Sequence, residues 1–357
     1  MATISVNYDS NGDVELILKE KTSGDQPALQ DGSSSTEQQM QRNYVLGNLH
    51  INVKEVRLQV SSEKLISSSC YFQAMFEGTR FREAEELKEH GLITIELSGS
   101  EDDPTAMMII LGILYSNDVQ VPIDIDLQTL HNVATLVDKY QFHATVSPQA
   151  VSWFNRLKAS QELPDTFDET LLMRLWVAWV FRIKDRFKEL SRVAQQCATK
   201  PIDPGDEKIL LPSGVLKDIN SQRETGFQKI EQELAAFKEE LINDVTSKES
   251  KNYMLKCMVF GHATFFCQDL ELSEFAAPDH AGSSIRTVLD RIKSTQYTND
   301  FFVASPSMES GSIVKNGLWD LKHRLEKAVE DMEMDKWGIE CANDELWPGH
   351  QRRKNEV

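Results

Sequence analysis

The chain has 357 residues, 40% of them hydrophobic, and its 38 Lys and Arg against 56 Asp and Glu residues give a net charge of −18. This length predicts about two domains. The negative charge disfavours non-specific binding to nucleic acid or to anionic lipid, because both need a basic surface, and no such partner is expected.

The cysteines point to a reducing compartment. There are five of them, Cys70, Cys197, Cys257, Cys267 and Cys341. Their wide and unpaired spacing is unlike that of a secreted disulfide scaffold. The N-terminus shows no signal-peptide pattern. The most apolar stretch, residues 171–181, contains Arg174 and is shorter than the about 20 residues that a membrane span needs. We therefore expect an intracellular protein, cytoplasmic or nuclear.

Alternating apolar residues predict three strands in the N-terminal half, at 14–19, 53–60 and 93–97. The first strand begins near Asp13, after the Asn11–Gly12 turn signal. Residues 22–43, between the first two strands, are rich in Gly, Ser, Gln and Pro, and are expected to form a mobile insertion.

Four helices are predicted around these strands from apolar residues at helical spacing. They begin at Ser61 or Ser62, at Asp103–Pro104, near Asp126, and after Ser147–Pro148. A Ser hydroxyl is expected to cap the first helix, and Gly78 to end it. Residues 83–90 are charged, and are predicted to form either a loop or a short helix.

The C-terminal half is predicted to be almost entirely helical, with a break at 201–214 that contains Pro and Gly. The expected helices lie at 171–197, around 227–241, at 253–269, at 284–292 and at 318–334. We therefore predict a domain at 1–160, a helical domain at 165–342 and a loose tail at 343–357. The chain shows no internal repeat.

Five motifs in the N-terminal half occur in the order found in a known family. They are Val56–Leu65 (VRLQVSSEKL), Ser67–Phe76 (SSSCYFQAMF), Glu83 followed by Ile93–Leu97 (ITIEL), Asp102–Met107 (DDPTAM) and Val133–Tyr140 (VATLVDKY). Over residues 13–158, without the insertion, the chain resembles the BTB (POZ) domain, particularly its divergent fungal forms. The resemblance implies an α+β fold, in which a small sheet packs with a helical cluster and a mostly α-helical domain follows.

The resemblance also implies an activity based on contact with other proteins. BTB domains self-associate, bind repressors or attach substrates to cullin-type ubiquitin ligases. Two features depart from particular members of the family. The helix and strand that many dimeric members exchange have little room before Asp13. The hydrophobic-x-acid signature of cullin binders is not evident at 115–122.

Cys257, His262 and Cys267 are the only residues that suggest a metal site. Their spacing fits no common zinc pattern, because zinc ligands usually begin two to four residues apart. Small buried thiols on an apolar helix are the favoured interpretation. We expect no metal and no cofactor.

No catalytic motif is evident either. The paired acids Asp102–Asp103, Glu85–Glu86 and Glu239–Glu240 lack a nearby His or further acid that would complete a site. Helix capping and solvated helix faces explain them. The chain has no G-x-S-x-G, no phosphate-binding Gly loop and no H-E-x-x-H.

Two further patterns leave alternatives open. Phe227, Ile230, Leu234, Phe237 and Leu241 form an apolar seam at helical spacing. The seam predicts packing within its own domain, with a short coiled-coil dimer as the alternative. The basic residues Lys322, His323 and Arg324, with 351–354, are typical of a solvated surface, with nuclear import as the alternative.

The leading hypothesis is a non-enzymatic adaptor, whose N-terminal module holds itself, a ligase or a transcription-related complex while the helical half holds a client. The alternative is an enzyme or small-molecule sensor, with its site among the aromatic residues of 171–187 and 253–275. A purely structural oligomer is the third hypothesis, and requires that the seam be exposed.

Overall fold

The computed structural model describes residues 3–19, 44–46, 49–51, 55–78, 81–97, 99, 102–116, 121–160, 163–203, 205–206, 209–246, 253–270, 282–295 and 321–340. The chain divides into two compact units. An N-terminal unit comprises Met1–Glu162, Trp176–Ile183 and Asn343–Val357, and a helical unit comprises Leu163–Leu175 and Lys184–Ala342. The predicted domain limits at 160, 165 and 343 stay a prediction.

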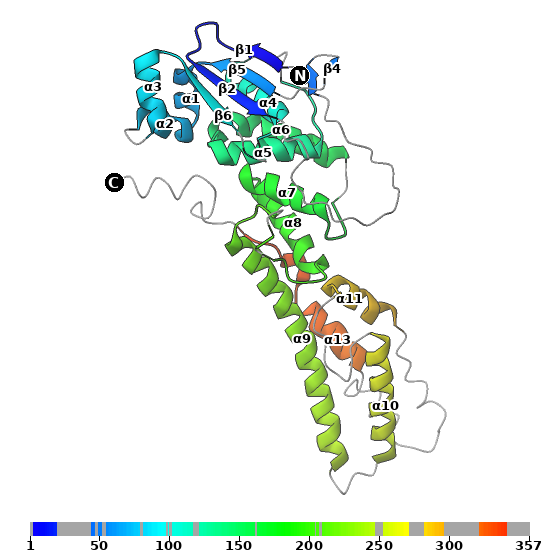
Figure 1. Cartoon of the computed structure of the whole chain (residues 1–357). Helices are drawn as coiled ribbons and strands as arrows, with labels where there is room; N and C mark the ends of the chain where they lie inside the picture. Colours follow the sequence, from blue (N-terminus) through cyan, green and yellow to red (C-terminus); the bar gives the residue numbers. More distant parts are fainter. Residues whose placement is uncertain are drawn as a thin grey trace, which may run out of the picture. The chain divides into compact units, whose positions relative to one another are not determined.

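The N-terminal unit contains a four-stranded sheet in the order β1-β5-β2-β6 (Figure 1). The strands are β1 (Thr3–Asn7), β2 (Val14–Lys19), β5 (Glu55–Val60) and β6 (Ile93–Leu97), and β3 (Tyr44–Leu46) pairs separately with β4 (Leu49–Ile51). Strand β2 pairs antiparallel with β5 and parallel with β6, which places Leu16 beside Leu58 on one side and beside Ile95 on the other. The three predicted strands are confirmed.

Strands β2, β5 and β6 share one buried apolar face. Their alternate residues are less than 9% exposed: Val14, Leu16, Leu18, Val56, Leu58, Val60, Ile93, Ile95 and Leu97. Because side chains of a strand alternate between faces, this period-two pattern puts them on one side of the sheet. The sheet therefore carries one wall of the core.

Strand β1 was not expected, and the prediction that the first strand begins near Asp13 is wrong. Thr3–Asn7 pairs in parallel with β5, in a register that sets Ile4 beside Val56. The segment has only two large apolar residues, so its periodicity is too weak to recognise locally. It becomes a strand because β5 offers a free edge. The expectation that the exchanged helix and strand of dimeric members have little room before Asp13 stays a prediction.

Six helices accompany the sheet. They are α1 (Ser62–Ser68), α2 (Cys70–Glu77), α3 (Arg82–His90), α4 (Pro104–Leu114), α5 (Leu127–Tyr140) and α6 (His143–Ser160). Figure 1 shows α1–α3 grouped beside one end of the sheet and α4–α6 stacked beneath it. The result is the predicted α+β arrangement of a small sheet with a helical cluster.

Two helix limits differ from the expectations, and residues 83–90, expected as a loop or a short helix, form a helix. The helix predicted from Ser61 to Gly78 is interrupted at Ser69, whose Oγ accepts a hydrogen bond from the Phe72 amide and so starts α2. Residues 83–90 belong to a helix that ends at Gly91 with φ 68°. Helix α6 begins before Pro148 rather than after it.

The second unit is built from helices. They are α8 (Lys184–Cys197), α9 (Ser213–Thr246), α10 (Tyr253–Asp269), α11 (Ile285–Ser294) and α13 (Leu321–Glu330), followed by a 3-10 turn at Met334–Lys336. Helix α7 (Glu169–Val180) belongs partly to each unit. The single run predicted at 171–197 is two helices, because Arg182 takes a left-handed conformation with φ 56° between them.

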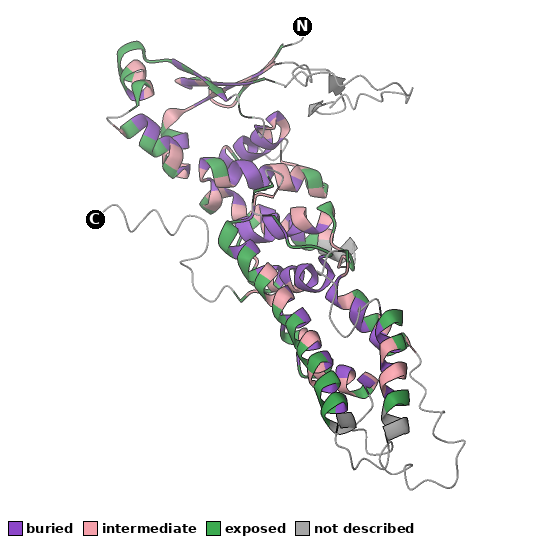
Figure 2. Ribbon diagram, turned by 60° about the horizontal axis from the view of Figure 1, so that its bottom comes forward, coloured by how far each residue is buried: buried purple, intermediate pink, exposed green. Residues whose placement is uncertain are grey.

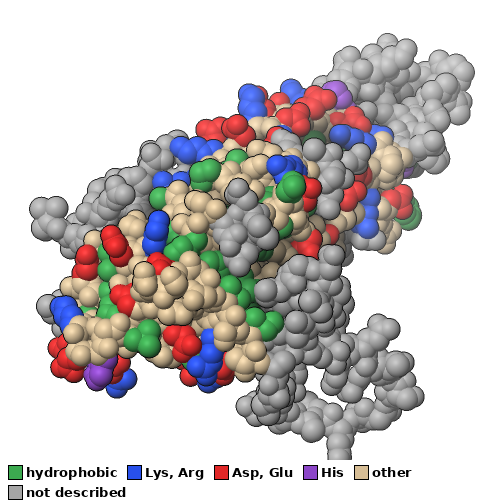
Figure 3. Space-filling view, turned by 90° about the horizontal axis from the view of Figure 1, so that it is seen from above, with side chains coloured by type: hydrophobic (Ala, Val, Ile, Leu, Met, Phe, Trp, Pro, Cys, Tyr) green, Lys and Arg blue, Asp and Glu red, His purple; other side chains and the backbone are tan. Residues whose placement is uncertain are grey.

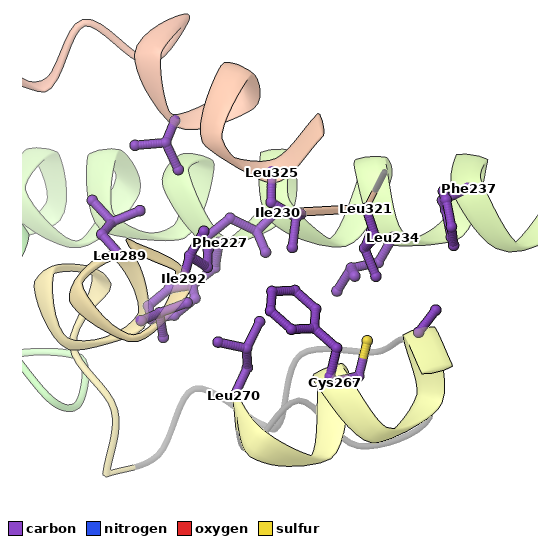
Figure 4. Close-up of a cluster of buried hydrophobic side chains, with 14 of the residues drawn as sticks. Phe227, Ile230, Leu234, Phe237, Cys267, Leu270, Leu289, Ile292, Leu321 and Leu325 are labelled. Carbon is purple, nitrogen blue, oxygen red and sulfur yellow. The ribbon is translucent and has the colours of Figure 1, made fainter. Parts of the chain in front are cut away.

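The core of the helical unit lies along α9. Figure 4 shows Phe227, Ile230, Leu234 and Phe237 facing side chains from α10, α11 and α13. Each of the five predicted seam residues is at most 1% exposed, and Figure 2 shows the buried stripe of α9 alternating with exposed residues. The seam therefore packs within its own unit, and the coiled-coil alternative and the structural oligomer that required an exposed seam are wrong.

Some expectations lie outside the described residues. These are the insertion at 22–43, the tail at 343–357 and the basic run at 351–354. Among the described helices, none is both long and apolar enough to cross a membrane.

Candidate interaction surfaces

The Asp102 carboxylate joins two of the sequence motifs inside the N-terminal unit. Its Oδ1 accepts hydrogen bonds from Lys139 Nζ at 2.8 Å and from the Tyr140 hydroxyl at 2.9 Å. Its Oδ2 accepts from the Gly99 amide at 2.8 Å. The carboxylate is 1% exposed. Burial, together with the negative charge of Asp102, raises the pKa of Tyr140, so the phenol remains a donor.

The paired acids Asp102 and Asp103 thus have separate roles. Asp103 is the N-cap of α4 and accepts from the Ala106 amide at 2.8 Å, as predicted. The expectation of a cap or a solvated face is wrong for Asp102, because its buried carboxylate binds two side chains of α5, the nearer of them 37 residues later in the chain. A contact at that separation leaves no local pattern.

Helix α1 is capped by a residue from outside the predicted motif. The Asp13 carboxylate accepts hydrogen bonds from the Ser62 amide and the Ser62 hydroxyl, both at 2.6 Å. Ser61 occupies the N-cap position without a side-chain cap bond, which corrects the expected hydroxyl cap. The Asp13 carboxylate, which precedes β2, therefore fixes the connection between β5 and α1.

Exposed apolar side chains flank helix α3. Phe81 is 44% exposed at its start and Leu92 is 54% exposed just after its end. Between them, α3 presents mainly charged residues. In the view from above, Figure 3 shows hydrophobic side chains dispersed between acidic and basic ones. This is the mixed surface expected of a non-obligate protein interface.

The structure does not group the residues that raised the question of a metal site, Cys257, His262 and Cys267. Cys267 is fully buried in the core along α9, whereas Cys257 is exposed, so the expectation of a buried thiol is wrong for Cys257. Within the part of the chain that the structure describes, no group of three His, Cys, Asp or Glu residues could hold a metal ion.

The other paired acids lie on helix surfaces. Glu86 pairs with Arg82 at 2.7 Å on α3, and Glu240 pairs with Arg324 at 2.7 Å between α9 and α13. The charges of these two acids are used in surface ion pairs.

Two of the predicted basic residues hold the helical unit together. Lys322 Nζ donates to the backbone oxygens of Lys293 and Thr295, and Arg324 pairs with Glu233 and Glu240. These contacts connect α13 to α11 and α9. The nuclear-import alternative stays a prediction.

The aromatic residues behind the enzyme or sensor alternative are largely core residues. Trp176, Trp179, Phe181, Phe187 and Phe266 are all at most 7% exposed. Phe260 is half-buried, and Phe265 is 68% exposed. A cleft of about 760 Å³ lies between α11, α13 and the turn after α13.

Comparison with known proteins identifies the N-terminal unit. Residues 37–148 match the family model of the BTB/POZ domain, and no curated protein or solved structure matches the chain. The match spans β3 to α6 and includes the Asp102 network, while β2 extends the same sheet toward the N-terminus. The resemblance to fungal members stays a prediction. The chain therefore contains a BTB/POZ domain, a module of protein–protein interaction, within residues 37–148.

Proposed function

We propose that this protein is a non-enzymatic adaptor, which holds itself or another protein through the BTB/POZ domain and a client through the helical unit. The family match over residues 37–148 carries the proposal, because BTB/POZ domains act by protein–protein contact and oligomerisation. The partner is a second copy, a cullin-type ubiquitin ligase or a transcription-related complex, and the site of action is cytoplasmic or nuclear.

The physical chemistry of α3 supports this role. Phe81 and Leu92 offer apolar area at the two ends of a charged helix, and contact energy at interfaces concentrates in such exposed apolar anchors. The net charge of −18 opposes non-specific association and favours partners that bring a defined basic or apolar surface.

The experiment measures assembly of the full chain. Size-exclusion chromatography with light scattering reports self-association, and titration with a purified cullin N-terminal domain reports ligase binding. The double variant Phe81→Glu/Leu92→Glu is expected to weaken whichever complex forms.

Ala144→Glu is the control variant, since it adds an acid at an exposed position in the first turn of α6. A full chain that stays monomeric, binds no cullin and retains no other protein would contradict the proposal. Equal binding by the Phe81→Glu/Leu92→Glu variant and the wild type would place the contact on another face of the domain.

The competing enzyme or sensor hypothesis loses its main support. It depended on aromatic residues lining a pocket, and most of those in the described parts of 171–187 and 253–275 pack in the core.

A further inference from the structure

Residues 334–340, which follow α13 and are called the strap below, are bound to α8 through their main chain. Gln196 Nε2 donates a hydrogen bond to the Met334 carbonyl at 3.0 Å. Arg192 Nη1 donates to the Asp335 carbonyl at 2.9 Å. Both side chains of α8 therefore hold the first half of the strap by groups that are present in any peptide.

Two acceptors of α8 hold the second half of the strap in the same way. The Gly338 amide donates to Gln195 Oε1 at 2.9 Å. The Ile339 amide donates to Ser191 Oγ at 2.9 Å. The four side chains of α8 that bind the strap are three to five residues apart, so they share one face of the helix. This face, made by residues 191, 192, 195 and 196, is called the track below.

Contacts inside the helical unit orient the track. Arg286 Nη2 donates to Gln196 Oε1 at 2.9 Å, which turns the amide so that Nε2 faces the strap. The Ser191 hydroxyl donates to the Lys188 carbonyl at 3.1 Å, and its lone pairs remain for an amide of the strap. Side chains that are already oriented lose less entropy when a peptide binds to them. The track is thus preorganised for a peptide main chain.

A tryptophan–glycine pair gives the strap its specificity. Trp337 is 6% exposed, and a Cβ at Gly226 of α9 would lie 2.9 Å from its Cη2, so the ring needs a glycine beside it. Gly338 has φ 116°, and a Cβ there would lie 2.4 Å from the Lys188 carbonyl oxygen. Only glycine fits that position without strain. Main-chain hydrogen bonds with one side-chain pocket are a general mode of peptide recognition.

The strap has few of the contacts that would make it part of the core. Asp335, Lys336 and Glu340 are exposed, and the other members apart from Trp337 are half-buried. Segments with few buried apolar contacts open at a lower free energy than the whole domain unfolds. Because Trp337 is the one deeply buried side chain of the strap, opening requires only that this ring leave its site.

We propose that the strap is an internal ligand, which occupies a peptide-binding site on α8 and is replaced there by a client segment that carries a tryptophan–glycine pair. The main chain of the client would bond to the track, and its tryptophan would fill the site beside Gly226. The attached strap competes at a high effective concentration, so the site stays closed until a client is present. The inference rests on the proposed adaptor function and specifies the chemistry of the client.

The first test measures hydrogen exchange of the full wild-type chain. Amides of 337–340 are expected to exchange at least about 100-fold faster than those of 227–237 in α9, because the strap opens locally. Their exchange rate is also expected to stay constant at low urea concentrations, since local opening exposes little surface. Mass spectrometry of peptic fragments measures both segments in one sample.

The second test measures binding in trans by fluorescence anisotropy. The probe is a labelled peptide with the sequence of residues 331–340, and it is added to full chains with different straps. Gly338→Ala prevents the chain's own strap from closing, because alanine is strained at φ 116° and meets the Lys188 carbonyl. This variant is expected to bind the probe at least about tenfold more tightly than the wild type does.

Two changes serve as controls for this binding. Gly282→Ala also replaces a glycine of positive φ in the helical unit, where a Cβ meets nothing within 4 Å, and is expected to bind the probe as the wild type does. Adding Ser191→Ala/Gln195→Ala to Gly338→Ala removes two acceptors of the track. Probe binding should then fall by about tenfold.

Three results would overturn the proposal. The first is exchange of the strap amides at the same rate and with the same urea dependence as those of α9. The second is equal probe binding by the wild type, Gly338→Ala and Gly282→Ala. The third is loss of the helical circular dichroism signal in Gly338→Ala, which would make the strap an integral part of the core. None of these measurements involves assembly through the BTB/POZ domain, so failure of the strap proposal and failure of the adaptor proposal are distinguishable.

Discussion

Asp102 and Lys139, 37 residues apart in the chain, form an ion pair of 2.8 Å in which the carboxylate is 1% exposed and the ammonium group 35% exposed. The same carboxylate accepts from Tyr140, whose ring lies in the aromatic cluster with Tyr71 and Phe72. This contact ties the start of α4 to the end of α5. It gives a physical reason for two of the motifs by which the BTB/POZ domain is recognised.

Replacing Asp102 is therefore expected to cost far more than replacing its neighbour. Asp102→Ala leaves the buried Tyr140 hydroxyl and the Gly99 amide without their acceptor, and should lower the free energy of unfolding by about 3 kcal/mol. Asp103→Ala removes one helix cap and should cost about 1 kcal/mol. Urea denaturation measures both, and equal losses would contradict the different roles assigned to the two acids.

Arg223 is predicted to be a structural residue of the helical unit. It is 2% exposed, its Nε donates to the Ala198 carbonyl at 2.9 Å, and its guanidinium lies over the Phe227 ring at 4.7 Å. Arg223→Lys keeps the charge but loses the planar fork, and should lower the free energy of unfolding by about 2 kcal/mol.

The exposed Lys229 on the same helix serves as the control for Arg223. Lys229→Met should change stability by less than about 0.5 kcal/mol. Chemical denaturation measures both variants. If Arg223→Lys lowers the free energy of unfolding by less than about 0.5 kcal/mol, the buried hydrogen bonds of Arg223 contribute little.

Two glycines of α9 should respond to alanine in opposite directions. A Cβ at Gly226 would lie 2.5 Å from Ile285 Cδ1 and 2.9 Å from Trp337 Cη2, whereas a Cβ at Gly214 meets nothing within 4 Å. Gly226→Ala is expected to destabilise by about 1 kcal/mol, because overpacking exceeds the gain in helix propensity. Gly214→Ala should stabilise by up to about 0.5 kcal/mol. Thermal melts compare the two, and the same sign for both would refute the packing argument.

His143 should make the N-terminal unit sensitive to acid. Burial first, and then the charge of Arg182, lower the pKa of His143 from 6.5 to about 4, and the nearest carboxylate, Asp138, is 3.7 Å from Nε2. Below pH 6.5, His143 takes up a proton in the unfolded chain but stays neutral in the folded chain. The stability present above this pH is therefore lost as pH falls toward 4.

The comparison is between the wild type and His143→Gln. From about pH 7.5 to about pH 5, the wild type should lose about 2 kcal/mol more than the variant. Urea denaturation at the two pH values measures the difference, and parallel losses would place the acid sensitivity in other groups.

Local patterns were sufficient for most of the elements. Strands β2, β5 and β6 were predicted because their apolar residues alternate, and α4, α5 and α10 because theirs recur at helical spacing. Asp103 followed by Pro104 marked a helix start that the structure contains. Each of these signals depends on residues that are close together in the chain, so the sequence alone is sufficient to recognise it.

The contacts that position the candidate surfaces could not be read in this way. Strand β1 depends on the free edge of β5, the cap of α1 on Asp13, and the cleft on two helices, α11 and α13, that are separated in the chain. The seam at 227–241 was compatible with packing inside its own unit or against a second copy, until its partners on α10, α11 and α13 were known.

The sequence alone thus determined that the chain contains a BTB-like α+β module followed by helices, since motif order and periodicity are local properties. Only the tertiary structure decided that Asp102 is a buried acceptor rather than a solvated acid and that the seam is a core. The physical reason is the same in each case: burial and charge compensation depend on partners that are distant in the chain.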